Sequence, residues 1–413
     1  MSFDLKSNTL ERLGLRSWIN ASSWATNWGG NWLDERVLES MAEVGRTFVD
    51  IPQLMATSNE RLAEVCGVDA AYVTSGAGAG IALSVAASMC GTDTAKWKAL
   101  PDTSNLEKNE VAIPLAHRLS YLPQWKATGA KVYEYGQGGY LIRPTLDPPL
   151  GHYSGSAWIE ELRSSVTDRT CCLGYVDSYY TSPGSEVPLG DVVSVAHAND
   201  LPVIVDAACQ LPPVSRLTEY LDKGADIAIF SGGKGIRGPG NTGLVLARGK
   251  RGVALIDAMM KFGFPYHSVA RHYKVSKEDI VGLVVATEIF VQEADSWYES
   301  QMRSAEAIRG ALSDIPGLKC WIVPNDDSLY EHPRRVRVPR VRIEWDAGEL
   351  GISGADLDKI LAAEDPPIKI RAAMYGSMQT PDQVRTIDTY LLRDSEVEIV
   401  KDRVRKAFLS PSR

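Results

Sequence analysis

Strand-like and helix-like segments alternate between residues 60 and 293, and this alternation constrains the fold of the 413-residue chain most strongly. Helical patterns such as residues 189–198 and 217–223 lie between several short apolar runs that are typical of buried strands. We therefore expect an α/β fold with a mostly parallel, seven-stranded sheet covered by helices on both faces. The seven expected strands are residues 71–74, 111–114, 131–135, 172–176, 203–206, 226–230 and 243–247.

The pattern changes after a long helical stretch at residues 276–312. Further on, the expected strands are residues 318–323, 336–345 and 368–372, and the expected helices are residues 354–363 and 381–392. The chain should therefore have three parts, which are an N-terminal arm and helix (1–60), a large domain (61–293) and a smaller C-terminal α+β domain (294–413).

The expected arm carries a cluster of tryptophans, at Trp18, Trp24, Trp28 and Trp32. The last three repeat every four residues, but Gly29 and Gly30 argue against an uninterrupted helix. We expect the arm to pack on a neighbouring subunit, and the alternative is that it forms a platform for the substrate.

Composition limits the class of partner. The formal net charge is -8 and the basic residues are scattered, so we expect no nucleic-acid partner. The first residues lack the apolar core of a signal peptide, and the uncharged stretch at residues 70–92 is too rich in small residues for a membrane span, so we expect a cytoplasmic protein. The six cysteines show neither metal-ligand spacing nor a disulfide framework, so we expect reduced thiols and no metal.

Three chemical groups follow expected strands, and parallel strands of an α/β sheet present their carboxyl ends at one edge. Lys234 lies in the turn Gly232-Gly233-Lys234-Gly235 after strand 226–230, and Asp206 ends strand 203–206. The small residues from Ser75 onward follow strand 71–74 at a strand-to-helix junction, where free backbone N–H groups can hold a phosphate. An amine, a carboxylate and a phosphate cup together indicate an enzyme that uses pyridoxal 5'-phosphate (PLP) as its cofactor.

Lys234 would form the Schiff base with the cofactor and then act as a base, and its glycine neighbours would let the backbone approach a ligand closely. The alternative is an ordinary surface lysine in a glycine-rich turn. Asp206 would pair with the pyridine nitrogen and keep it protonated, so that the ring accepts electrons. The alternative is a carboxylate that only caps the turn after its strand.

The expected phosphate cup consists of backbone amides of Ser75, Gly76, Ala77 and Gly78, with a further contact from the Ser231 hydroxyl. A turn of small residues also suits close packing of a helix on a sheet. A nucleotide-binding P-loop would end in Gly-Lys-Ser/Thr, which this turn lacks. A dinucleotide-binding fold would place an acidic residue about twenty positions further on, and none is evident.

Other candidate site residues depend on weaker patterns. His117 follows strand 111–114, where its ring could stack on the cofactor or simply form part of the core. Arg271 and Arg371 are candidates for binding a substrate carboxylate or phosphate, because a guanidinium offers two parallel hydrogen bonds, although surface ion pairs are the alternative. Tyr179 is a candidate acid at the substrate.

The segment FSGGKGIRGPGNTG at residues 230–243 resembles the lysine motif of fold-type I PLP enzymes related to bacterial selenocysteine synthase. The chain looks most similar to the D-glucosaminate-6-phosphate ammonia-lyase branch, over roughly residues 15–290. The resemblance implies an aspartate-aminotransferase-like fold and a homodimer or larger homo-oligomer with active sites at subunit interfaces. It also implies the roles given above for Lys234 and Asp206. Further matching stretches are residues 19–21, 48–51, 73–77, 116–118, 205–208 and 274–283.

The expected activity is α,β-elimination from a small amino-acid substrate through a Cα carbanion, which releases ammonia and a 2-oxo acid. An amino-acid racemase or epimerase and an aminotransferase are the enzymatic alternatives, because one fold supports several reactions. A synthase acting on tRNA is disfavoured by the acidic composition. A PLP-fold binding protein without turnover is disfavoured because storage of a ligand needs no carboxylate at the ring nitrogen.

Overall fold

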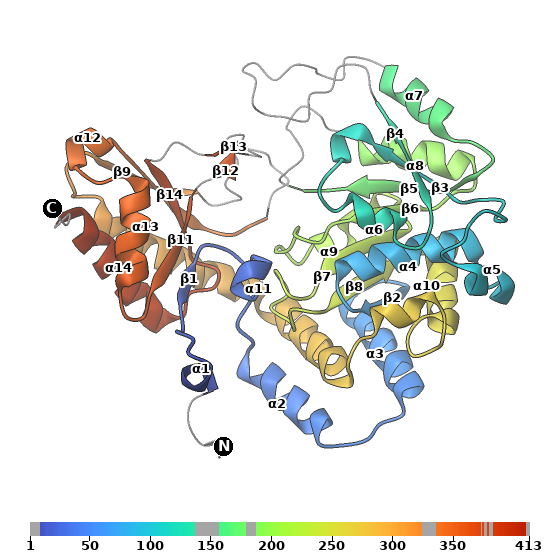
Figure 1. The fold of residues 1–413 in the computed structure, drawn as a ribbon, viewed down its shortest axis with the longest axis horizontal. Coiled ribbons are helices and arrows are strands. Elements are labelled where there is room, and N and C mark those ends of the chain that lie inside the picture. Colours follow the sequence, from blue (N-terminus) through green and yellow to red (C-terminus); the bar gives the residue numbers. More distant parts are fainter. Residues whose placement is uncertain are drawn as a thin grey trace. The chain divides into compact units, whose positions relative to one another are not determined.

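The computed structural model describes residues 9–136, 157–178, 187–323, 336–372, 374–375, 378–379 and 383–409 (Figure 1). The chain forms two compact units. The larger contains residues 30–294 and 332–336, and the smaller contains residues 1–29, 295–331 and 337–413. In this division the first sixty residues are shared between the two units instead of forming a part of their own.

The larger unit is built on a seven-stranded sheet with the strand order β2-β8-β7-β6-β5-β3-β4. Only β8 runs antiparallel to its neighbours, so the predicted mostly parallel sheet is confirmed. The strands are β2 (Ala70–Thr74), β3 (Glu110–Pro114), β4 (Lys131–Tyr135), β5 (Thr170–Val176), β6 (Val203–Asp206), β7 (Ile227–Ser231) and β8 (Gly243–Ala247).

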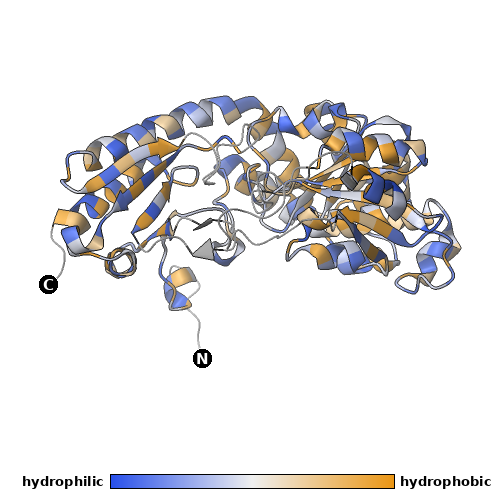
Figure 2. Ribbon diagram, turned by 90° about the horizontal axis from the view of Figure 1, so that it is seen from above, coloured by the Kyte–Doolittle hydropathy of each residue, from blue (hydrophilic) through white to orange (hydrophobic). Residues whose placement is uncertain are grey.

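Burial explains why these strands read as continuous apolar runs. Every residue of β3, β5, β6 and β8 is buried, as expected for a sheet covered on both faces. Figure 2 shows hydrophobic residues along these strands and polar residues on the outer faces of many helices. Each fully buried aliphatic side chain contributes about 1.5–3 kcal/mol, so the central strands provide much of the stability of this unit.

Helices of the larger unit pack on this sheet. Helix α4 is buried all round, because twelve of its fourteen residues are buried. This burial accounts for the lack of charged residues at positions 70–92. No helix in the described part of the chain is long and apolar enough to cross a membrane. The helices are α2 (Glu35–Gly45), α3 (Ile51–Cys66), α4 (Ala77–Cys90), α5 (Thr94–Ala99), α6 (Leu122–Lys126), α7 (Ala157–Ser165), α8 (Leu189–Ala198), α9 (Arg216–Asp222) and α10 (Gly249–Phe262), with short 3-10 turns η2 (Leu115–His117) and η3 (Val269–Tyr273).

The smaller unit contains a five-stranded sheet with the order β1-β11-β14-β10-β9. One face of this sheet packs with helices around a core that includes Ile343, Ile370 and Val400. The strands are β1 (Ile19–Ala21), β9 (Leu318–Val323), β10 (Arg340–Trp345), β11 (Ile368–Ala372) and β14 (Val384–Asp388), and β12 (Met374–Tyr375) pairs with β13 (Met378–Gln379). Helix α11 (Lys277–Leu312) begins in the larger unit and ends in the smaller one. The other helices of the smaller unit are α1 (Thr9–Arg12), the 3-10 turn η1 (Thr26–Trp28), α12 (Ala347–Leu350), α13 (Gly354–Ala363) and α14 (Asp394–Leu409).

The helix predicted at residues 381–392 is wrong, because this segment contains strand β14. Val384, Ile387 and Leu391 have helical spacing, which led to the prediction. In the structure β14 pairs with β11 on one side and β10 on the other, and all five of its residues are buried. Pairing on both edges therefore outweighs the local periodicity.

Part of the tryptophan-rich arm packs on its own chain. Strand β1 lies parallel to β11, and the ring of Trp24 meets the ring of Tyr390 edge to face, with centroids 5.0 Å apart. Trp18 and Trp28 contact each other with ring centroids 5.1 Å apart. These residues complete the smaller unit, and packing of the arm on a neighbouring subunit stays a prediction.

A buried ion pair in the smaller unit offers a test of the fold. Arg340 Nε lies 2.8 Å from Asp388 Oδ2, and the two side chains are 3% and 1% exposed. We expect Arg340→Met to destabilise the unit by about 3–5 kcal/mol, because Asp388 would keep a buried charge without this counter-ion. The double variant Arg340→Met/Asp388→Leu should lose less than the sum of the single variants, measured by urea unfolding. Additive losses would contradict the coupling.

Candidate active site

Strand register brings the predicted site residues to one edge of the large sheet. Gly243 at the start of β8 pairs with Thr74 on one side and Ser231 on the other, so the Ser75 turn and the end of β7 are neighbours. Asp206 at the end of β6 pairs with Val176 of β5 and Ile229 of β7. The amine, the carboxylate and the turn of small residues therefore follow strands that lie close together in the sheet.

Lys234 lies in a tight turn directly after β7, and its side chain is half-buried. A Cβ atom on Gly233 would lie 2.6 Å from Gly240 Cα, and one on Gly235 would lie 2.2 Å from the Leu211 carbonyl oxygen. The glycines on both sides of Lys234 are therefore required by close backbone packing.

Asp206 is 6% exposed, and its Oδ1 accepts a hydrogen bond of 3.0 Å from the Ala208 backbone N–H. Burial raises the pKa of its carboxyl group, while the Ala208 N–H and the positive charge of Lys234 oppose that effect. The negative charge of Asp177 raises the pKa further. Lys234 and Asp206 are thus close enough to interact electrostatically.

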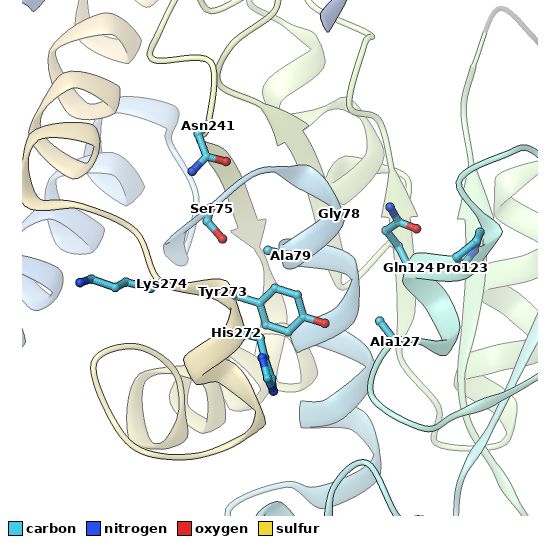
Figure 3. Close-up of a pocket in the computed structure, with 10 residues that line it drawn as sticks. All are labelled: Ser75, Gly78, Ala79, Pro123, Gln124, Ala127, Asn241, His272, Tyr273 and Lys274. Carbon is cyan, nitrogen blue, oxygen red and sulfur yellow. The ribbon is translucent and has the colours of Figure 1, made fainter.

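The expected phosphate cup lies at the start of α4, and its role stays a prediction. Gly76, which precedes the helix, has φ 106° and ψ 157°, a conformation that favours glycine, and no side chain caps the first turn. The adjoining cavity has a volume of about 560 Å³ (Figure 3). A Cβ atom on Gly78 would lie 2.9 Å from Gln124 Cγ, so a larger residue there would crowd the cavity wall. The residues that line the cavity are Ser75, Gly78, Ala79, Pro123, Gln124, Ala127, Asn241, His272, Tyr273 and Lys274.

Part of the wall of this cavity is polar. It contains the Ser75 hydroxyl and the first turn of α4, which suit an anion. Lys234 and Asp206 do not line it. The polar groups around it include Asn241 and Tyr273, both drawn in Figure 3. The sequence analysis missed Tyr273, because a single tyrosine in a short turn carries no signal.

His117 is buried and firmly held. Its Nδ1 accepts a 3.1 Å hydrogen bond from the Val176 backbone N–H, and its ring meets the Tyr175 ring edge to face at 4.5 Å. Burial lowers the pKa of His117 to about 3, so the imidazole is neutral and carries its proton on Nε2. Stacking of this ring on a cofactor stays a prediction.

A buried polar network that the sequence analysis missed lies beside Asp206. The Tyr220 hydroxyl donates to Asp177 Oδ2 at 2.7 Å, and Arg216, which is 4% exposed, donates to both Gln210 and Tyr220. Gln210 in turn donates to the Asp177 carbonyl, and the Asp177 N–H donates to the Asp206 carbonyl. The network therefore fixes the ends of β5 and β6 relative to α9.

The three residues predicted to bind the substrate do not all lie at the edge of the large sheet. Arg271 is exposed in η3, directly before the cavity-lining residues His272, Tyr273 and Lys274. Arg371 is half-buried on β11 of the smaller unit, where it pairs with Thr386. Tyr179 lies outside the described residues. The roles of these three residues stay predictions.

Comparison with known proteins identifies the fold class, although no family model matches. The chain is 29% identical over 403 residues to a D-glucosaminate-6-phosphate ammonia lyase of Salmonella typhimurium, covering 97% of each protein. A solved structure of D-glucosaminate-6-phosphate ammonia-lyase aligns with a TM-score of 0.78 and 26% identity, over 99% of this chain and 100% of that chain. This chain has the fold of fold-type I PLP enzymes.

Two further comparisons show how broad this fold-type I class is. A 5'-C-glycyluridine monooxygenase-decarboxylase from Streptomyces is also 29% identical, over 88% of this chain and 85% of that protein. A structure of SPT with PLP aligns with a TM-score of 0.56 at 13% identity, over 95% of this chain and 88% of that chain, and shows the shared fold. Relatives of equal identity are thus named for different reactions.

Neither a metal-binding cluster nor a disulfide is found among the described residues. The described residues contain no group of three or more His, Cys, Asp or Glu side chains that could hold a metal ion. All six cysteines are free thiols, and four of them are buried. Burial raises the pKa of Cys66 and of Cys90 to about 12, which keeps these thiols protonated.

The low pKa of His117 leads to a prediction about stability in acid. As pH falls below about 6.5, the unfolded chain binds a proton at this residue while the folded chain does not, so stability falls until pH reaches about 3. In His117→Asn an amide oxygen can still accept from the Val176 N–H, but nothing titrates. We expect the apoprotein of this variant to lose up to ~2 kcal/mol less than the wild type between pH 7 and pH 5, measured by urea unfolding. Identical pH dependence would refute this account.

Proposed function

We propose that this enzyme catalyses PLP-dependent α,β-elimination from a small amino acid, releasing ammonia and a 2-oxo acid. The observation that carries the proposal is the arrangement of Lys234 and Asp206 on adjacent strand ends, where the charge of one acts on the other. The similarity to an ammonia lyase along 97% of the chain favours elimination.

The residues present suit the cofactor. We assign its phosphate to the first turn of α4, with Ser75, Gly76, Ala77 and Gly78 offering backbone N–H groups and Ser231 a hydroxyl. Ser231 pairs with Gly243, whose other neighbour is Thr74, so these groups belong to adjacent strands. When bound, PLP supplies an electron sink next to the Cα atom of the substrate.

Asp206 would hold the protonated ring nitrogen of the cofactor. Its burial raises the pKa of its own carboxyl group, which alone would favour the neutral form. Lys234 opposes this effect in the free chain, and a second cation at the ring nitrogen would oppose it further. The carboxylate is therefore poised to be ionised when the site is loaded.

Lys234 would first anchor the cofactor and then act on the substrate. Once the substrate amine replaces it, the Lys234 amine takes the proton from Cα, and a leaving group departs from Cβ with the bonding electron pair. The released enamine takes up one water molecule and yields ammonium and the 2-oxo acid. The tight turn around Lys234 restricts where this amine can lie.

The substrate class follows from the relatives and the cations. One relative is named for D-glucosaminate-6-phosphate, so we propose an amino acid that carries a second anionic group. Arg271 and Arg371 are the proposed contacts for the carboxylate or phosphate, and Tyr179 is a proposed acid near the substrate. We further propose a cytoplasmic homodimer or larger homo-oligomer.

Two substitutions test the cofactor assignment. Lys234→Ala should abolish the absorbance of bound PLP above 400 nm and lower activity by at least ~10³-fold, because anchor and base are both lost. Asp206→Asn should retain the absorbance but lower kcat by at least ~10²-fold, because the ring nitrogen loses its charged partner. An unchanged spectrum in Lys234→Ala would rule out the assignment.

A substrate screen distinguishes the reactions. Purified enzyme is incubated with amino acids, including phosphorylated ones, and ammonia, 2-oxo acid and loss of chirality are followed. We expect ammonia and 2-oxo acid in equal amounts without an amino acceptor. Deuterium exchange at Cα without net consumption would instead identify a racemase, and a requirement for an acceptor would identify an aminotransferase.

A further inference from the structure

Part of the tryptophan-rich arm contacts the Lys234 turn directly. Within the larger unit, Asn31 Nδ2 donates a 3.0 Å hydrogen bond to the Lys234 carbonyl oxygen. The preceding residue, Gly30, has φ +79°, and a Cβ atom there would lie 3.0 Å from the Gly233 carbonyl oxygen. The Trp32 ring centroid lies 5.2 Å from the guanidinium carbon of Arg237. Three consecutive residues thus touch the turn on both sides of Lys234.

The contact made by Asn31 fixes the backbone of the reacting residue itself. The Lys234 carbonyl oxygen also accepts from the Arg237 N–H at 2.9 Å, a bond that belongs to the turn. Asn31 adds a second donor from a segment 203 positions earlier in the chain. Two donors in different segments restrict rotation of the peptide, and that rotation would carry the lysine side chain with it.

The two polar atoms of the Asn31 side chain differ in their surroundings. Asn31 Oδ1 is buried and has no hydrogen-bond partner among the described residues. Such an atom costs stability, and native proteins contain few of them. Asn109 differs, because its Nδ2 donates to the Thr103 carbonyl and its Oδ1 accepts from Arg169. Among the described residues, Asn31 thus makes one side-chain hydrogen bond, and that bond goes to the Lys234 turn.

We propose that Asn31 is a positioning residue for Lys234, and that Gly30, Asn31 and Trp32 are the part of the arm on which the reaction depends. The inference rests on the proposed role of Lys234 as anchor and base. A proton is transferred efficiently only when the reacting atoms are aligned, and a displacement of about 1 Å can cost 10²-fold in rate. Loss of the Asn31 donor frees the Lys234 peptide to make such a displacement.

The test compares Asn31→Leu with Asn31→Asp and a matched control. The first variant removes both polar atoms, and the second keeps the shape but replaces the donor with an acceptor. The control is Asn199→Leu, because Asn199 Nδ2 also donates to a backbone carbonyl, that of Val195, at the end of α8. We expect both Asn31 variants to lose about 10²-fold in kcat with a KM near that of the wild type. The control should retain both constants.

A second readout needs neither cofactor nor turnover. The rate at which an amine-acylating reagent modifies Lys234 in the apoprotein, measured by peptide mass spectrometry between pH 7 and pH 10, reports the placement of this amine. Both Asn31 variants should differ from the wild type by about tenfold, while their thermal midpoints stay within about 4 °C of it. The control should label at the wild-type rate.

The outcomes separate this inference from the proposed function. Wild-type labelling of Lys234 and wild-type kcat in both Asn31 variants would overturn the positioning role. Altered labelling in a protein that releases no ammonia from any amino acid would retain the positioning role and reject the elimination reaction. If Asn31→Leu fails to fold, Asn31→Asp decides through the same two measurements.

Discussion

The hydrogen-bonded register of β2, β8, β7 and β6 is the constraint on which the site depends. Because β8 runs antiparallel between β2 and β7, its first residue, Gly243, lies between Thr74 and Ser231. The Ser75 turn and the lysine turn therefore meet at the start of β8. A Cβ atom on Gly243 would lie 2.4 Å from the Gly76 carbonyl carbon, so this junction has no room for a side chain.

Much of the large unit could be predicted from its sequence, because its strands are buried on both faces and flanked by turn residues. All seven strands were expected within two residues of their observed ends. Lys234 and Asp206 were recognisable because each follows such a strand. The strand β14 was not, since its identity depends on pairing with β10 and β11, and nothing in residues 384–388 alone reveals that pairing.

Tertiary contacts also explain which site residues the sequence could not reveal. Asp177, Arg216 and Tyr220 form one network only because β5 and α9 lie side by side in space, and each residue alone resembles an ordinary surface group. The contact made by Asn31 was not predicted, because the tryptophans around it indicated packing on a neighbouring subunit. Residues that act through a partner distant in sequence carry no local pattern, whereas residues that act at a strand end do.

The hydrogen bond between Asn31 and Lys234 joins two segments that the ribosome makes at different times. Asn31 leaves the ribosome first, and its partner carbonyl follows 203 residues later. At about 5–20 residues per second, that interval is on the order of 10–40 s. During this time Asn31 has no partner carbonyl from Lys234. The contact between Asn31 and the lysine turn therefore forms only after the chain has been made past residue 234.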